Sequence, residues 1–153
     1  MHSDPLDSSI EIKNENLPTL KACSLDFCKR LVHLNLSMNN ISIVDGGFEC
    51  ANLKTLILSD NLIKDIKPSM LLKLPALRVL NLDMNQISRI QNISHLTELL
   101  DLSIMQNKVA QIEGISTLTK LRKLNLSFNR IQKLEGLSTL QMLEVLELGK
   151  NQI

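Results

Sequence analysis

Six copies of one short pattern run through most of this 153-residue chain. Each copy fits L-x-x-L-x-L-x-x-N-x-I, with similar apolar residues allowed, and successive copies begin 22, 24, 22, 22 and 22 residues apart. The copies begin at Leu31, Leu53, Leu77, Leu99, Leu121 and Leu143 and read LVHLNLSMNNI, LKTLILSDNLI, LRVLNLDMNQI, LLDLSIMQNKV, LRKLNLSFNRI and LEVLELGKNQI. A fixed period of roughly 20–29 residues predicts a solenoid, in which each unit stacks only on its neighbours.

The alternation inside each copy predicts a short strand. Counting the first Leu as position 1, positions 4 and 6 are apolar and flank a position that is mostly polar, as at Leu34 and Leu36. This is the period of a strand with one buried face, so stacked copies form a parallel sheet on the inner, concave side. The outer segment that follows is too short for a full helix. We expect one turn of 3₁₀- or α-helix there, slightly longer in the 24-residue unit that contains Pro68 and Pro75.

Position 9 is asparagine in every copy. An Asn amide carries both a donor and an acceptor, and can therefore satisfy backbone groups left inside the stack where the chain turns away from the strand. We therefore predict a structural ladder, and not a binding site, for Asn39, Asn61, Asn85, Asn107, Asn129 and Asn151.

The pattern divides the chain into two parts. Residues 1–30 read as an N-terminal tail with a degenerate capping repeat that starts at Asp7 and places Cys23 and Cys28 at apolar core positions. Six repeats follow, at 31–52, 53–76, 77–98, 99–120, 121–142 and, incomplete, 143–153. The sixth has no outer segment and no polar cap. An open apolar end favours aggregation or fraying, so we expect that the C-terminal cap is missing and that the chain is a fragment of a longer repeat protein.

Composition argues against several kinds of partner and compartment. Seventeen basic and sixteen acidic residues give a net charge of +1, without the basic surplus that nucleic acid or an anionic membrane attracts. The sequence has no apolar run long enough for a transmembrane helix, and its acidic first residues do not resemble a secretory signal. Three cysteines without such a signal favour a reducing compartment, and we expect a cytoplasmic or nuclear protein.

The sequence shows no arrangement of residues suited to catalysis. The three histidines fall in the tail (His2), on the concave face (His33) and on an outer segment (His95), so no nucleophile–base pair is expected. Cys23 and Cys28 lack a second cysteine or histidine pair for a metal, and no glycine-rich phosphate-binding motif occurs. We therefore expect a protein that is not an enzyme and has no metal or cofactor.

The 22-residue units, seen in NRIQKLEGLSTLQML, LNLSFNRI and LELGKNQI, resemble the leucine-rich-repeat class typified by the leucine-rich regulatory subunit of protein phosphatase 1. The resemblance runs from about Leu31 to Ile153 and implies an α/β leucine-rich-repeat solenoid. Such a solenoid has a curved parallel sheet on its concave face and short 3₁₀ or α turns on its convex face. Members of the class bind other proteins on the concave face, and the phosphatase regulator presents acids and aromatics there.

The side chains expected to face outward, on and just after each strand, are those at positions 3, 5, 7 and 8. The core needs none of these side chains, so apolar residues and acids among them are expected to form a binding surface. The candidates are Phe128, Met38, Met84, Met105, Ile57, Val79, Asp60, Asp83, Asp101 and Glu147. Scattered surface apolar residues are common, so Met38 or Met84 covering a neighbouring repeat stays an alternative.

Two functional hypotheses remain open at this stage. In the first, the protein docks a globular partner on its concave face, with the catalytic subunit of protein phosphatase 1 as the first candidate. In the second, it is a structural or assembly component of the cilium, the centrosome or the tubulin machinery, with tubulin or axonemal and centrosomal proteins as partners.

Overall fold

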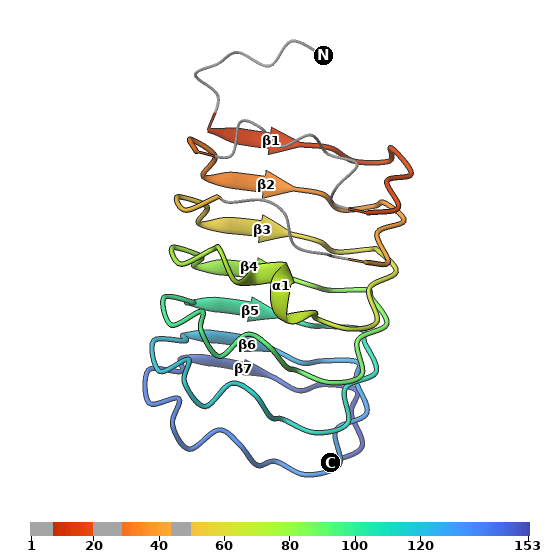
Figure 1. The fold of residues 1–153 in the computed structure, drawn as a ribbon. Helices are drawn as coiled ribbons and strands as arrows, with labels where there is room; N and C mark the ends of the chain where they lie inside the picture. The colour runs from red at the N-terminus through yellow and green to blue at the C-terminus, as the bar shows by residue number, and fades with distance from the viewer. Residues whose placement is uncertain (1–7, 20–28, 44–49) are drawn as a thin grey trace.

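The computed structural model describes residues 8–19, 29–43 and 50–153. In these residues one parallel sheet of seven strands follows chain order (Figure 1). The strands are β1 (Ser9–Glu11), β2 (His33–Asn35), β3 (Thr55–Ile57), β4 (Val79–Asn81), β5 (Asp101–Ser103), β6 (Lys123–Asn125) and β7 (Val145–Glu147). The predicted solenoid with its parallel sheet is confirmed.

Every strand occupies the same three positions of its repeat, positions 3 to 5. Position 4 therefore pairs with position 4, as Leu34 does with Leu56 and Leu80 with Leu102. β1 continues this register, because Ser9 lies opposite His33 in the unit that starts at Asp7.

The core is a column of Leu and Ile side chains between the sheet and the outer segments. Positions 1, 4, 6 and 11 are buried throughout the first five repeats, and positions 14, 17 and 20 join them in the third and fourth. Burying one such side chain stabilises the fold by about 1.5–3 kcal/mol, so most of the stability comes from contacts between neighbouring repeats.

The outer segments contain the short turns that were expected, with the helix in the 24-residue repeat. Within the described residues the one helix is α1 (Pro68–Leu71), which lies in the 24-residue repeat and begins with proline, a residue suited to the first helical position. Other repeats have two successive turns instead, as where the Leu96 amide donates to Ile93 O (2.9 Å) and the Leu99 amide to Leu96 O (3.0 Å). These are 3₁₀-type i→i+3 hydrogen bonds, but they are offset by three residues and do not form a continuous helix.

Glycine is required at position 16 of the fourth and fifth repeats. Gly114 and Gly136 have φ of +72° and +77°, and a Cβ on either would lie 2.3 Å from a carbonyl oxygen of the preceding repeat. Asn92 has the same position in the third repeat with φ of +60°, and its Nδ2 donates to Ile66 O at 2.7 Å. Each of these residues takes the left-handed conformation where the chain turns into the outer segment.

The C-terminal end of the stack is less buried than its middle. Leu146, at the centre of β7, is 37% exposed, whereas its neighbour Leu124 is 1% exposed. Leu134, the apolar residue at position 14 of the fifth repeat, is 56% exposed, because the sixth repeat ends at position 11 and has no position-14 side chain to cover it.

Several expectations fall outside the described residues. They concern His2, Cys23 and Cys28 and the outer parts of the capping repeat and of the first repeat. Cys50, by contrast, is described, and it is fully buried and disulfide-bonded. The sequence reading, which favoured reduced cysteines, did not predict this bond.

Candidate protein-interaction surface

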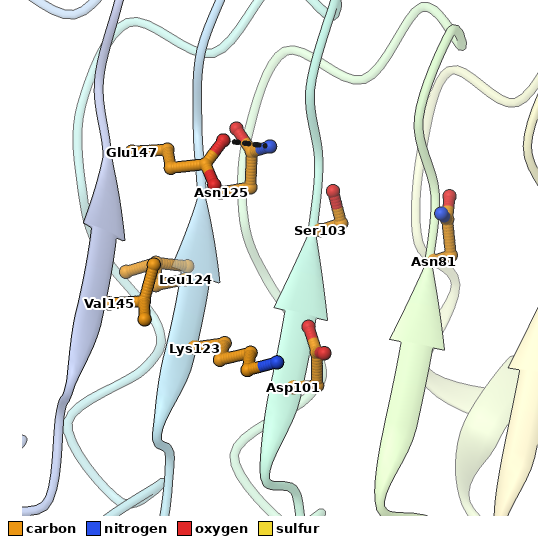
Figure 2. A pocket seen from close by; sticks show the side chains of 8 residues that line it. All are labelled: Asn81, Asp101, Ser103, Lys123, Leu124, Asn125, Val145 and Glu147. Atoms are coloured by element: carbon orange, nitrogen blue, oxygen red, sulfur yellow. Dashed lines mark hydrogen bonds between the residues drawn. The ribbon is translucent and has the colours of Figure 1, made fainter.

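The concave face is formed by side chains at positions 3 and 5 of the strands, which point away from the core. Figure 2 shows this face over β4 to β7, where eight residues line a shallow hollow of about 250 Å³. The lining residues are Asn81, Asp101, Ser103, Lys123, Leu124, Asn125, Val145 and Glu147.

Charged groups of both signs line this hollow. The Lys123 ammonium points toward the Asp101 carboxylate on the neighbouring strand (Figure 2). Glu147 Oε2 accepts a 2.8 Å hydrogen bond from Asn125 Nδ2. The candidates Asp101 and Glu147 therefore line one hollow, and Lys123, which the sequence reading did not select, lies between them. The position of Lys123 in its repeat, position 3, was the sequence signal that could have identified it as a concave-face residue.

Asparagines at position 5 organise the backbone that leaves the strand. Asn35 Oδ1 accepts from the Ser37 amide (3.0 Å), and Asn125 Oδ1 accepts from the Ser127 amide (2.9 Å). Ser37 and Ser127 are buried, so the expectation that all position-7 side chains face outward is wrong for these two residues. The tight turn draws position 7 toward the core.

The Asp83 carboxylate forms three hydrogen bonds within the protein, which a free surface acid would not. Its Oδ1 accepts from the Met105 amide (2.7 Å) and the Ser103 hydroxyl (2.5 Å), and its Oδ2 accepts from Asn81 Nδ2 (3.0 Å). The fourth repeat has Ser103 where the first, third and fifth repeats have the position-5 asparagine, so Asp83 of the preceding repeat accepts from the Met105 amide instead. The carboxylate therefore ties two repeats together.

The ten candidate residues divide into two groups by exposure. Half-buried between their neighbours are Ile57, Val79, Met105, Asp83 and Asp101. Exposed are Met38, Met84, Phe128, Asp60 and Glu147. All but one of the exposed group belong to position 8, just after the strand. The most accessible part of the candidate surface is therefore the rim where the strands end, and not the middle of the sheet.

Position 8 has an unusual backbone conformation. The φ angles of Met38, Asp60, Met84 and Phe128 are +59°, +54°, +53° and +56°, and those of Gln106 and Lys150 are +56° and +60°. The left-handed region costs a residue with a Cβ about 1–2 kcal/mol, so the surrounding structure must impose it. The neighbouring residue that constrains the backbone there is the asparagine of the ladder at position 9.

The asparagine ladder links each repeat to the one before it. Asn107 Oδ1 accepts from the Ile87 amide (2.9 Å), and its Nδ2 donates to Leu82 O (2.9 Å) and to Ile104 O (3.2 Å) of its own repeat. The same pattern of bonds recurs at Asn61, Asn85, Asn129 and Asn151. Asn39 makes the equivalent bonds to the capping repeat, accepting from the Leu17 amide and donating to Ile12 O, and it also accepts from the Glu15 amide. The amides are thus saturated by backbone groups, as a structural role requires.

At the N-terminal end of the concave face, Lys13 forms a 2.9 Å ion pair with Glu11. The hydrogen bond from Lys13, together with its charge, lowers the pKa of Glu11 below its usual value. Both residues are solvent-exposed or nearly so, and exposed pairs add little stability.

The other expected features are placed as follows. His33 is exposed on β2, whereas His95 is half-buried on an outer segment with Nε2 3.0 Å from Leu71 O. Among residues 8–19, 29–43 and 50–153, no three His, Cys, Asp or Glu side chains are grouped so as to hold a metal ion. In the same part of the chain, no helix has the length and apolar character needed to cross a membrane.

A parallel sheet with a buried asparagine ladder and leucine-filled turns defines a leucine-rich-repeat solenoid. The chain belongs to the leucine-rich repeat family, since the family profile described as Leucine Rich repeats (2 copies) matches residues 51–96 and 97–139. Proteins built from these repeats are in general protein–protein interaction modules and are typically non-catalytic.

Solved structures agree with this assignment. A leucine-rich-repeat protein of Leptospira interrogans is 28% identical with a TM-score of 0.81, and the match covers 94% of this chain and 37% of that one. An internalin of Listeria monocytogenes is 26% identical with a TM-score of 0.71, over 84% of this chain and 38% of that one. Internalin C2 of the same species is 27% identical with a TM-score of 0.70, over 95% of this chain and 72% of that one.

This chain therefore spans well under half the length of the first two structures. A comparison with curated proteins yields no match.

Proposed function

We propose that this protein is a non-catalytic interaction module that binds a globular partner protein on its concave face. The observation that carries the proposal is the exposure of Met38, Met84 and Phe128 on one rim of the sheet, with the exposed Asp60 between the two methionines. Methionine and aromatic side chains are favoured at protein interfaces because they offer large adaptable contacts, and the core makes no use of these three.

The catalytic subunit of protein phosphatase 1 is our first candidate partner. The support for it is the resemblance of the repeat units to those of the phosphatase regulator, together with acids and one aromatic at concave positions: Asp60, Asp101, Glu147 and Phe128. The proposed action is occupation of the partner's surface, in the cytoplasm or the nucleus. The alternative function, as a component of the cilium, the centrosome or the tubulin machinery, is tested with tubulin as the comparison partner.

The test is a binding titration with purified phosphatase 1 catalytic subunit, with tubulin dimer titrated in parallel. Asp101→Arg reverses a charge on the concave face, and Glu113→Arg makes a matched reversal on the outer segment of the same repeat. We expect binding of the phosphatase subunit that Asp101→Arg weakens by about tenfold or more and that Glu113→Arg leaves unchanged.

Two results would contradict the proposal in different ways. Equal weakening by both variants would remove the concave face as the docking surface. Binding of tubulin but not of the phosphatase subunit would exclude the phosphatase as the partner and favour the cytoskeletal hypothesis.

A further inference from the structure

Position 8 alternates between apolar and polar residues along the whole stack. From the first to the sixth repeat, this position-8 row reads Met38, Asp60, Met84, Gln106, Phe128 and Lys150. We propose that this row binds an amphipathic α-helix of the partner protein, an inference that rests on the proposed function. The helix lies along the solenoid axis, and its apolar side chains are seven residues apart.

The three apolar members of the row are exposed and lie on the same rim. Met38, Met84 and Phe128 are 49%, 43% and 51% exposed, although each lies next to a buried position-9 asparagine. All have the same left-handed φ, so their side chains leave the backbone in the same direction. The row is thus a periodic set of contacts and not a scatter of surface residues.

Backbone hydrogen bonds determine the spacing along the row. The Met38 amide donates to Ser59 O (3.0 Å), the Asp60 amide to Asp83 O (2.9 Å) and the Met84 amide to Met105 O (2.9 Å). The same bond recurs from Gln106 and Phe128, so the row continues the parallel ladder beyond the strands. Neighbouring strands lie about 4.8 Å apart, which places every second member of the row about 9.6 Å from the next.

This spacing fits an α-helix better than an extended strand. Residues i and i+7 of a helix share one face and lie about 10.5 Å apart along its axis. Residues on one face of a strand recur about every 6.7 Å, which does not match. Flexible methionine side chains can absorb the remaining difference of about 1 Å per interval.

A polyproline helix has a similar repeat, about 9.3 Å for three residues. Proteins bind such segments in aromatic-lined grooves, whereas methionine-rich surfaces are used for amphipathic helices. The row holds two methionines and one aromatic, and the chain contains neither Trp nor Tyr. The α-helix is therefore the occupant that the row favours.

The polar members of the row define the charge pattern of the partner. Asp60 lies midway between Met38 and Met84, and Lys150 lies beyond Phe128. The partner helix therefore carries a basic residue three or four positions from the apolar residue that contacts Met38, so that it faces Asp60. It carries an acidic residue about four positions beyond the one that contacts Phe128, so that it faces Lys150. A helix that runs from the first repeat toward the sixth carries these charges in this order, and one that runs the other way carries them in reverse, so the heptad peptide is tested in both sequence directions.

The test uses synthetic helical peptides, each cross-linked on its polar face to hold the helix. The first has Leu at i, i+7 and i+14, Lys at i+3 and i+4, and Glu at i+18. The control peptide has the same composition with Leu at i, i+5 and i+10, which takes them off one face. A proline-rich PxxP peptide is the third probe. Binding is measured by fluorescence anisotropy with the full chain, its Met84→Asp variant and its Leu72→Asp variant.

Met84→Asp and Leu72→Asp are matched, because both residues are exposed apolar side chains and Leu72 lies beside α1, outside the row. We expect the heptad peptide to bind, Met84→Asp to weaken it by about tenfold or more, and Leu72→Asp to change nothing. Asp60→Lys should weaken binding as well, and a peptide with Glu in place of its lysines should restore it.

Equal binding of the heptad and control peptides, no binding of either, or preference for the PxxP peptide would each overturn the helix inference. The outcome of this test can be distinguished from a failure of the function proposed above. If the partner protein binds and depends on Asp101 while the heptad peptide does not bind, the concave docking face stands and the helix does not.

Discussion

The Asp83 carboxylate of the third repeat accepts a 2.7 Å hydrogen bond from the Met105 amide of the fourth. Its other contacts are the Ser103 hydroxyl and the Asn81 side-chain amide. A residue that the sequence presents as a surface acid thus substitutes for the asparagine that the fourth repeat lacks at position 5.

We predict that Asp83→Ala lowers the free energy of unfolding by about 1–3 kcal/mol, because the half-buried Met105 amide and Ser103 hydroxyl lose their acceptor. Asp83→Asn keeps one acceptor oxygen and should cost less. Urea unfolding followed by circular dichroism measures both. An Asp83→Ala protein as stable as the wild type would show that solvent replaces the carboxylate at no cost.

Asn107→Leu should be more destabilising than either Asp83 variant. It leaves the Ile87 amide and the Leu82 carbonyl without their partner inside the stack, at a cost on the order of 1–3 kcal/mol for each group. Thermal melting tests this, with exposed Gln106→Leu next to it as the control. If both variants melted at the wild-type temperature, the ladder would not be structural.

Gly114→Ala and Gly149→Ala form a second matched pair. At Gly114 a Cβ would lie 2.3 Å from Ile90 O with φ at +72°, whereas the nearest atom at Gly149 would be 3.9 Å away. We expect Gly114→Ala to lose about 1–3 kcal/mol of stability through backbone strain, and Gly149→Ala to lose almost none. Similar losses at both sites would mean that glycine is not needed for this turn.

Phe128→Ala should separate binding from folding. The ring is 51% exposed, so its removal should scarcely change the melting temperature. Binding of the partner should weaken by about tenfold or more if the rim is the docking surface. Calorimetric melting together with a binding titration decides the case. A large drop in melting temperature would place Phe128 in the core and remove it from the docking surface.

Much of the fold could be predicted from the pattern of the repeats. The strand positions, the parallel register and the buried face follow from leucines at fixed spacing, since each repeat contacts only its neighbours. The short turns of the outer segments were also predicted, but not which repeats form an α-helical turn and which form 3₁₀-type turns. Two 3₁₀-type turns and a helical turn bury leucines at the same spacing, and only Pro68 and two extra residues distinguish the repeat that holds α1.

The candidate surface was predicted less completely. Position in the repeat identified the concave side chains but not their exposure, which depends on side chains about 22 residues away. The rows at positions 7 and 8 illustrate this, because Ser37 is buried while Met38 beside it is exposed.

The sequence by itself determined the period, the buried leucine column and the asparagine ladder, because a one-dimensional stack repeats the same local chemistry in every unit. The tertiary structure alone decided which surface groups are engaged across repeats, as for Asp83. It also decided the left-handed backbone at position 8 and the burial of Ser37 beside the exposed Met38. These properties depend on the contacts that each residue makes with the adjacent repeat once the units are stacked.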